Sequence, residues 1–416
     1  MSVTTAHRRT RPAAAHPSVR LVAPDLRIAG GPASSVLRVA CSVGPITRDS
    51  AARATGLSVA TVNRQVSALL GAGLLRERAD LTVPGATGRP RVPFEVDHEA
   101  FSTIGIHIGA VSTGIVMSDL RGRVLAAVEI PTPGGSSEAA LMSITRSTCA
   151  FAARWHRRTL LWVGVATGGR VDTARGTVDH PRLGWRDGRV AAVVGSGLGV
   201  PVSVSGHVEA MAAAELLLAP APSNSIAAQD GTSLYVYARE TAGMALTIDG
   251  RVHTPASGPG SIAHLPTGSS ALCGCGARGC LEASVGDRAV VAAAVNRAIV
   301  APHTRPSIAA VYGAAQGGSE AARELLTERA RILGRTVALL RDMFNPDRVV
   351  LGGQAFTAYP AAIVHVREAF VQHSTLAPGN VRVTGFGDRV QQYAATVVSL
   401  SALYSDPLAA MRTVAA

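Results

Sequence analysis

Lysine is absent from the sequence, so all 40 basic residues, set against 28 acidic ones, are arginines. The sequence also lacks any uncharged apolar run of about 18 residues, so neither a transmembrane helix nor a membrane partner is predicted. The first 20 residues carry twin arginines, but no apolar segment follows them, and no export signal is predicted. Without such a signal we expect a cytoplasmic protein whose few cysteines serve a metal site rather than disulfides.

The positive charge is unevenly distributed along the 416 residues. Residues 1–94 contain 13 arginines and four acidic residues, which is +9 of the net charge of +12. A biased genome composition would spread arginine evenly along the chain. Because the charge is concentrated in one segment, that segment is predicted to bind a polyanion.

A short helix, a tight turn and a longer helix are predicted in the stretch ITRDSAARATGLSVATVNRQVSALLGAGLLRE. Thr47 is suited to cap the first helix, Gly56 to end it, and Ser58 to cap the second. The pattern is typical of a helix-turn-helix, whose second helix enters the DNA major groove. We assign residues 29–97 to a winged helix-turn-helix domain and residues 1–28 to a disordered basic tail. The predicted DNA-contacting residues of the second helix are Ser58, Thr61, Asn63, Arg64 and Gln65.

Two short strands around a loop rich in Gly and Pro are predicted in LLRERADLTVPGATGRPRVPFEVD. This is typical of a β-wing, and its Gly-Arg-Pro-Arg run predicts that Arg89 and Arg91 contact the minor groove or the DNA backbone. The alternative is an ordinary solvated hairpin followed by a linker. The helix pair, the wing and the charge asymmetry agree, and together they favour binding to double-stranded DNA.

From about Phe101 onwards, strands alternate with helices, which predicts an α/β domain over residues 98–416. A long helix is predicted before the strand DRVVLGGQA, and a single final helix, YAATVVSLSALYSDPLAAMR, is predicted to close the chain. Within this domain, three of the five cysteines fall in a span of eight residues, in CGCGARGCLE, and a histidine lies just upstream. Such clustering indicates a metal site.

From about residue 33 to the end, these landmarks together resemble the ROK family of repressors, open reading frames and kinases. The motif HLPTGSSALCGCGARGCLE carries the resemblance most strongly, and VGVATGGRVDTARGTV, PRLGW and NPDRVVLGG also match. A helix-turn-helix followed by Gly-Arg-Pro is similar to the regulators of the family rather than to its free-standing kinases. The metal ligands that the resemblance implies are His264, Cys273, Cys275 and Cys280. Three thiolates and one imidazole fill a tetrahedral zinc site and leave no open position, so a structural Zn²⁺ is expected.

The resemblance also implies a two-lobed fold of the actin–hexokinase type with a cleft between the lobes. Lobe one is expected to comprise residues 101–206 and the C-terminal helix at 391–416, and lobe two residues 207–390. In the kinases of the family, this cleft is where ATP phosphorylates a sugar.

The kinase residues that the resemblance implies are replaced in this sequence. His107 stands in place of the Asp of the first phosphate turn, and Arg239, Glu240 and Thr241 replace most of the second. Gly206 and His207 take the places of an Asn-Asp pair that holds the catalytic base. Ser261 replaces a sugar-binding Glu, and Arg182 replaces an Asn. Glu209 is expected to point roughly 200° around its helix from the catalytic direction. Sugar kinase activity is therefore not expected.

An effector in the cleft is a hypothesis, because in related regulators that keep the sugar contacts, sugar binding shifts the lobes and changes DNA affinity. Two histidines and an arginine favour an anionic effector, such as a phosphosugar or sugar acid, over a neutral sugar. The predicted cleft residues are His107, Arg182, His207, Ser261, His264 and Glu282.

We therefore predict a repressor of carbohydrate-related or other metabolic genes that binds its operator as a homodimer or homotetramer. Two alternatives remain: a sugar kinase fused to a DNA-binding domain, and a scaffold that binds DNA or a partner without any ligand.

Overall fold

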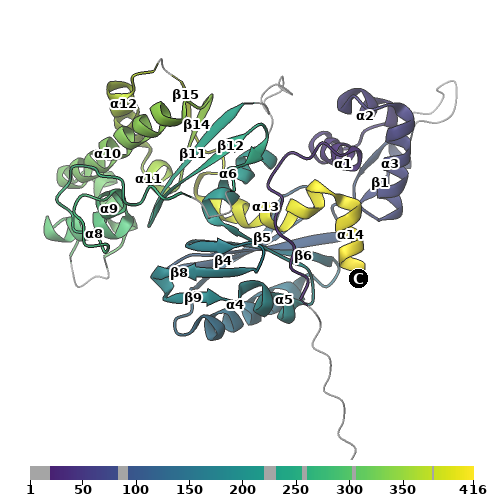
Figure 1. Ribbon diagram of the computed structural model, residues 1–416, viewed down its shortest axis with the longest axis horizontal. Coiled ribbons are helices and arrows are strands. Elements are labelled where there is room, and N and C mark those ends of the chain that lie inside the picture. Colours follow the sequence, from purple (N-terminus) through teal and green to yellow (C-terminus); the bar gives the residue numbers. More distant parts are fainter. Residues whose placement is uncertain (1–18, 83–91, 220–230, 255–259, 302–305, 377–378) are drawn as a thin grey trace, which may run out of the picture.

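The computed structural model describes residues 19–82, 92–219, 231–254, 260–301, 306–376 and 379–416. Figure 1 shows a small helical domain beside one α/β lobe, with the second α/β lobe on the far side of helix α13. Among the described residues, no helix combines the length and the apolar character needed to cross a bilayer.

The N-terminal domain consists of three helices and a two-stranded antiparallel sheet. Its elements are α1 (Pro32–Val43), α2 (Arg48–Thr55), α3 (Val59–Gly71), β1 (Leu75–Glu77) and β2 (Phe94–Val96). The predicted ends are confirmed: the Thr47 side chain accepts the amide of Ser50, and Ser58 accepts that of Thr61. Gly56 ends α2 in the left-handed conformation, at φ 70°. Local sequence thus determines the angle between α2 and α3.

This domain shares a hydrophobic core with lobe one instead of standing apart. Val62, Val66 and Leu69 of α3 are fully buried, and they belong to the same cluster as Trp162 and Leu403. Polar contacts also join the N-terminal domain to lobe one. Glu95 of β2 accepts hydrogen bonds from Arg76 and Arg78 of its own domain and from Arg121 of lobe one. Shared apolar burial of this kind holds the two units in one orientation.

Each α/β lobe is built on a five-stranded mixed sheet. Lobe one has the strand order β10-β6-β3-β4-β5, and lobe two has the order β13-β12-β11-β14-β15. The strands of lobe one are β3 (Phe101–Ile108), β4 (Ser112–Ser118), β5 (Val124–Pro131), β6 (Thr159–Thr167) and β10 (Val202–Gly206). Those of lobe two are β11 (Thr232–Ala238), β12 (Ala242–Ile248), β13 (Arg251–Val252), β14 (Arg348–Gly352) and β15 (Asn380–Val383). Each sheet joins an antiparallel three-strand meander to two parallel strands, so the lobes repeat one architecture.

A smaller antiparallel sheet and the remaining helices complete the lobes. The small sheet contains β7 (Arg170–Asp172), β8 (Thr177–His180) and β9 (Trp185–Gly188). The helices before residue 220 are α4 (Ser137–Ala152), α5 (Val190–Leu198) and α6 (His207–Leu217). Those of lobe two are α7 (Leu281–Val285), α8 (Asp287–Asn296), α9 (Ile308–Gln316), α10 (Glu320–Phe344), α11 (Gln354–Thr357) and α12 (Ile363–His373). The chain ends with α13 (Val390–Ser405) and α14 (Pro407–Ala415).

Helix α13 lies directly on the sheet of lobe one because two strands have glycine beneath it. A side chain at Gly105 of β3 would collide with the backbone of Ala395, and one at Gly164 of β6 would collide with that of Ser399. The close approach lets Ser399 donate a 2.8 Å hydrogen bond to Thr103. The two glycines therefore position α13, which lies between the lobes in Figure 1.

Two expectations about the ends of the chain are corrected. Residues 1–18 of the predicted tail lie outside the described residues, but residues 19–28 are ordered and pair with both lobes. Leu26 of this segment is buried, at 4% exposure, and the neighbouring apolar residues are mostly half-buried, so the segment is part of the fold. The final helix is two helices: Asp406 caps α14, and Pro407 at its first position interrupts α13.

Candidate functional site

The four predicted metal ligands come together in one loop of lobe two. The donor atoms of His264, Cys273, Cys275 and Cys280 all lie within 4.8 Å of one another. Cys273 Sγ lies 3.6 Å from His264 Nδ1, and Cys275 Sγ lies 3.7 Å from Cys280 Sγ. A set of three sulfurs and one imidazole nitrogen fits a tetrahedral soft-metal site of the zinc type.

Backbone hydrogen bonds fold this loop before any metal is considered. The Cys273 amide donates to Ala277 O and the Gly276 amide to Cys273 O, which forms a tight turn between the first two cysteines. Gly279 has φ 76°, and a side chain there would collide with Ser269 O. A residue with a Cβ would disfavour this backbone angle and would collide with the loop, so the fold of the loop itself requires Gly279.

The loop from His264 to Cys280, called the metal loop here, also borders a cavity of about 460 Å³ between the lobes, which His264 lines. Every residue predicted for the cleft lines this cavity: His107, Arg182, His207, Ser261, His264 and Glu282. His264 belongs to both places, and Glu282 follows Cys280 by two residues in α7. A metal in the loop would therefore hold the side of the cleft to which Glu282 belongs.

Three imidazoles form the inner wall of the cavity. The rings of His107 and His207 stack with centroids 5.7 Å apart. His180, which the sequence analysis did not identify, is also buried. It lies near His207, since a Cβ at Gly168 would contact both rings. Burial lowers the pKa of His207 to about 4, and nearby positive charge adds to this. Burial likewise lowers the pKa of His107, and that of His180. All three rings are therefore neutral near pH 7.

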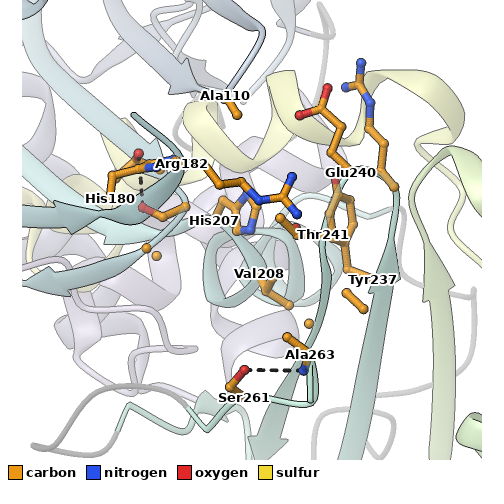
Figure 2. Close-up of a pocket in the computed structure, with 18 of the residues that line it drawn as sticks. Ala110, His180, Arg182, His207, Val208, Tyr237, Glu240, Thr241, Ser261 and Ala263 are labelled. Atoms are coloured by element: carbon orange, nitrogen blue, oxygen red, sulfur yellow. Dashed lines mark hydrogen bonds between the residues drawn. The ribbon is translucent and has the colours of Figure 1, made fainter. Parts of the chain in front are cut away.

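Two imidazole nitrogens facing this region have no partner among the described protein atoms: Nε2 of His107 and Nδ1 of His180. Buried polar atoms normally have a hydrogen-bond partner. Figure 2 shows His180, His207 and Arg182 grouped at the cavity, with Tyr237 opposite them on β11.

The expectation that Glu209 points away from the cleft is wrong. Glu209 is 6% exposed and lines the cavity, and a side chain at Gly206 would overlap its carboxylate. Glu209 stands in the first turn of α6 and folds back toward the helix start, a reach that acidic residues at this position commonly make. Burial raises the pKa of its carboxyl. The missing side chain at Gly206 is thus replaced in space by one three residues later.

Three arginines line the cavity, and all of them have partners; Arg170 pairs with Asp179 within lobe one. Arg182 donates a 2.5 Å hydrogen bond to Glu282, and this ion pair joins lobe one to lobe two across the cavity. Arg239 donates a 2.6 Å hydrogen bond to Gln391 at the start of α13. An anion in the cleft would compete with Glu282 for Arg182, a cost that the sequence pattern alone did not reveal.

The two turns that face phosphate in kinases of the family are altered, as the sequence indicated. The turn between β11 and β12 consists of Arg239, Glu240 and Thr241, closed by a hydrogen bond from the Arg239 amide to Thr241 O. His107 occupies the end of β3 next to the other turn. A buried neutral imidazole cannot replace a carboxylate toward Mg²⁺.

The start of helix α3 presents a polar surface to solvent. Ser58, Asn63 and Arg64 are exposed, and Thr61 and Gln65 are partly exposed. The helical spacing of Val59 would place its apolar side chain in the core, but that side chain is 48% exposed on the same surface. Arg89 and Arg91 lie outside the described residues.

The model of the ROK family matches residues 103–389, so the chain belongs to the ROK family. A transcriptional regulator of Mycobacterium tuberculosis, Rv0485, is 56% identical over 400 residues, covering 94% of this chain and 89% of its own. Among solved structures, a ROK family transcriptional regulator homologous to the E. coli MLC protein aligns at TM-score 0.75 and 21% identity, covering 92% of this chain and 98% of its own. A ROK glucokinase of Streptomyces griseus aligns at TM-score 0.61 and 22% identity, covering 72% and 99%. The two structures show the two-lobed fold.

Proposed function

We propose that this protein is a cytoplasmic DNA-binding transcriptional regulator, acting as a repressor of carbohydrate-related or other metabolic genes. The exposed polar start of α3, on a winged helix whose core is fused to lobe one, is the observation that carries the proposal. Asn63 and Arg64 stand where side chains of a recognition helix reach base edges. The name of the mycobacterial relative, a transcriptional regulator, supports the same function.

A single winged helix covers one half-site, so the protein would bind DNA as a homodimer or homotetramer with two-fold symmetry. Half-sites would then be separated by about 34–36 Å or a multiple of it. Arg89 and Arg91 would contact the minor groove or the DNA backbone beside each half-site.

The metal loop would hold a structural Zn²⁺ through His264 and the three cysteines. The ion would have no open coordination position, and its contribution would be to stabilise the loop that carries Glu282. Zinc is the ion favoured by three thiolates and one imidazole.

The cleft would bind an effector without phosphorylating it. A carboxylate at the first phosphate turn and the Asn-Asp pair of the kinases are both missing. A phosphosugar or sugar acid that paired with Arg182 would compete with Glu282 for the guanidinium, which would weaken the bridge between the lobes. Such an effector distinguishes two states of the protein, as a regulatory ligand must. A neutral sugar, held by Glu209 and the imidazoles, is the second candidate.

The primary test is selection of bound fragments from the source genome by the full-length protein, at a stated salt concentration. We expect a few sites that share a two-fold motif. Replacing Arg64 with Ala should weaken binding to that motif by about 1–3 kcal/mol and relax one base position. The matched control is Arg146→Ala, an exposed arginine on α4.

Two results would favour the alternatives. Binding without a shared motif would favour a scaffold that uses the winged helix as a charge anchor. Turnover of ATP with any member of a hexose panel would restore the kinase assignment. For the effector, calorimetry that detects neutral sugars but no phosphosugar or sugar acid would reject the anionic class.

A further inference from the structure

Residues 19–28, called the strap here, pair with the outermost strand of lobe one. The Val22 amide donates to Val202 O, and the Val202 amide donates to Arg20 O, each at 2.9 Å. Ser203 Oγ donates a third bond to Val22 O. Val202 and Ser203 belong to β10, which is the edge strand of its sheet. The strap thus makes an isolated β-bridge to the edge of lobe one.

The same strap then pairs with the outermost strand of lobe two. The Ile28 amide donates to Gly250 O at 2.8 Å, and the Val252 amide donates to Leu26 O at 2.9 Å. Leu26 is buried in the core that contains Val252 and Val208. Strand β13, to which Val252 belongs, is also an edge strand. Figure 1 shows the dark purple strap crossing from the lower sheet, past the junction of the lobes, toward α1.

The two attachments are too close in sequence to let the lobes part freely. Only residues 23–25 separate Val22 from Leu26, and Pro24 among them has a restricted φ. A chain of this length spans at most about 14 Å when fully extended. A rotation that opens this flank beyond the reach of the strap must therefore break one attachment.

A second cavity, of about 460 Å³, lies beneath the strap and is lined by Pro24, Leu26, Gly206 and Glu209. Gly206 and Glu209 also line the effector cleft. The same two residues thus have the cleft on one side and the strap cavity on the other. A ligand that moved Glu209 would act directly beside the strap.

The strap leads directly into the DNA-binding domain. Helix α1 begins at Pro32, and Arg38 of α1 donates a 3.0 Å hydrogen bond to the carbonyl of Ala29, the residue that directly follows the strap. The other contacts of the domain described above are to lobe one, and Ser34 of α1 adds a bond to Ser405 of α13. Through the strap, α1 is also connected to lobe two.

We propose that the strap transmits the relative position of the two lobes to the winged helix, so that its release from lobe two lowers operator affinity. The proposal rests on the proposed DNA-binding function for its biological readout. In the attached state, the backbone bonds of Leu26 and Ile28 to lobe two restrain the chain just before α1, and α1 in turn packs against the recognition helix α3. Release of Leu26 removes that restraint.

The first arm of the test needs no DNA. Leu26→Ala releases the attachment to lobe two, and hydrogen exchange of α1 amides in the full-length protein should quicken at least five-fold. Arg20→Gln loosens the other end, where Arg20 donates to Thr413 O and Val414 O. Arg146→Gln is the matched surface control. Circular dichroism and thermal melting check that each variant is folded.

A crosslink tests the same attachment in the opposite direction. Arg27 and Arg251 face each other as an antiparallel pair flanked by the two backbone bonds, the closely spaced geometry that suits a disulfide. The double variant Arg27→Cys, Arg251→Cys is compared with its own reduced form, and the unmodified protein receives the same oxidant. Adding the crosslink to Leu26→Ala should restore slow exchange in α1.

The second arm measures operator binding with a fragment from the genomic selection. We expect about ten-fold weaker binding for Leu26→Ala, and recovery on crosslinking. Equal α1 exchange and equal affinity in the wild-type, released and crosslinked proteins would overturn the proposal. If α1 exchange responds but the wild-type protein selects no specific site, the strap coupling stands and the proposed function fails. If specific binding is found but the strap variants leave α1 exchange and affinity unchanged, the proposed function stands and the strap coupling fails.

Discussion

The metal loop and the inner wall of the cleft both contribute to the lining of one cavity, but they retain different shares of the residues expected for the family. In the loop, all four donors of the motif come together within 4.8 Å. In the inner wall, the acidic and amide groups of the kinases are replaced by His107, His207 and Gly206. We expect the loop to serve the stability of the fold, whereas the matching wall in the kinases of the family serves a reaction. The two regions are therefore expected to respond differently to substitution.

The largest expected effect comes from a substitution in the metal loop. Cys280→Ser should remove bound metal, from about one ion per chain to near none, and destabilise the fold by more than about 3 kcal/mol. Elemental analysis and thermal unfolding measure both quantities. Cys149→Ser is the control, because Cys149 lies outside the cluster. Full metal content and unchanged unfolding in Cys280→Ser would contradict a structural metal.

A double-mutant cycle tests the packing of Gly206 and Glu209 in the inner wall of the cleft. Gly206→Ala places a methyl group where the Glu209 carboxylate lies, and we expect a loss of about 1–3 kcal/mol from this overpacking. In a Glu209→Ala background the same substitution should cost much less, with a coupling of about 0.5–3 kcal/mol. Urea unfolding of the four proteins gives the coupling. Additive effects would mean that Glu209 does not occupy the space beside Gly206.

The neutral histidines predict an acid-sensitive cleft. The pKa of His207 is lowered to about 4 in the folded protein, against about 6.5 in the unfolded chain, so the unfolded state binds the extra proton. Stability is therefore complete above pH 6.5 and falls as the pH drops toward 4. Between pH 7.5 and 5.5 the expected loss is about 1.4 kcal/mol from His207 alone.

The measurement for this prediction is urea unfolding at pH 7.5, 6.5 and 5.5. His207→Gln should flatten the pH dependence by the amount given, and His253→Gln, at an exposed position, should leave it unchanged. An equal slope in His207→Gln and the wild-type protein would show that His207 is not buried in its neutral form.

The smallest expected effect on stability comes from the bridge across the cavity. Both partners of the Arg182–Glu282 pair are 26% exposed, so Glu282→Gln should change stability by about 0–1 kcal/mol. It should nevertheless free Arg182, and glucose 6-phosphate should then raise the melting temperature more than in the wild-type protein. Arg182→Gln in the same background should abolish that rise. Equal shifts in all three proteins would remove Arg182 from the effector site.

Local patterns were sufficient wherever neighbours in sequence form the structure. Thr47, Gly56 and Ser58 define the helix-turn-helix through hydrogen bonds or dihedral angles of adjacent residues, and the structure confirms them. The metal ligands lie in one short loop, so their spacing alone predicted the cluster. The two-lobed fold of the ROK family is likewise confirmed.

Three features could not be predicted, because each depends on residues far apart in the chain. The burial of His180 depends on contact with other strands, and the paired state of Arg182 depends on a residue 100 positions away. The orientation of Glu209 depends on the space left by Gly206, a steric condition that helical periodicity does not include.

The sequence by itself determined the elements with local codes: the caps of the helix-turn-helix, the metal loop, and the replacement of the kinase residues one by one. Tertiary structure decided how the replacements act together, because the cleft is assembled from both lobes. It also decided that residues 19–28 are a strap and not a tail. These residues carry no local signal of order, and they are ordered through isolated bridges to the edge strands β10 and β13 on either side of the junction.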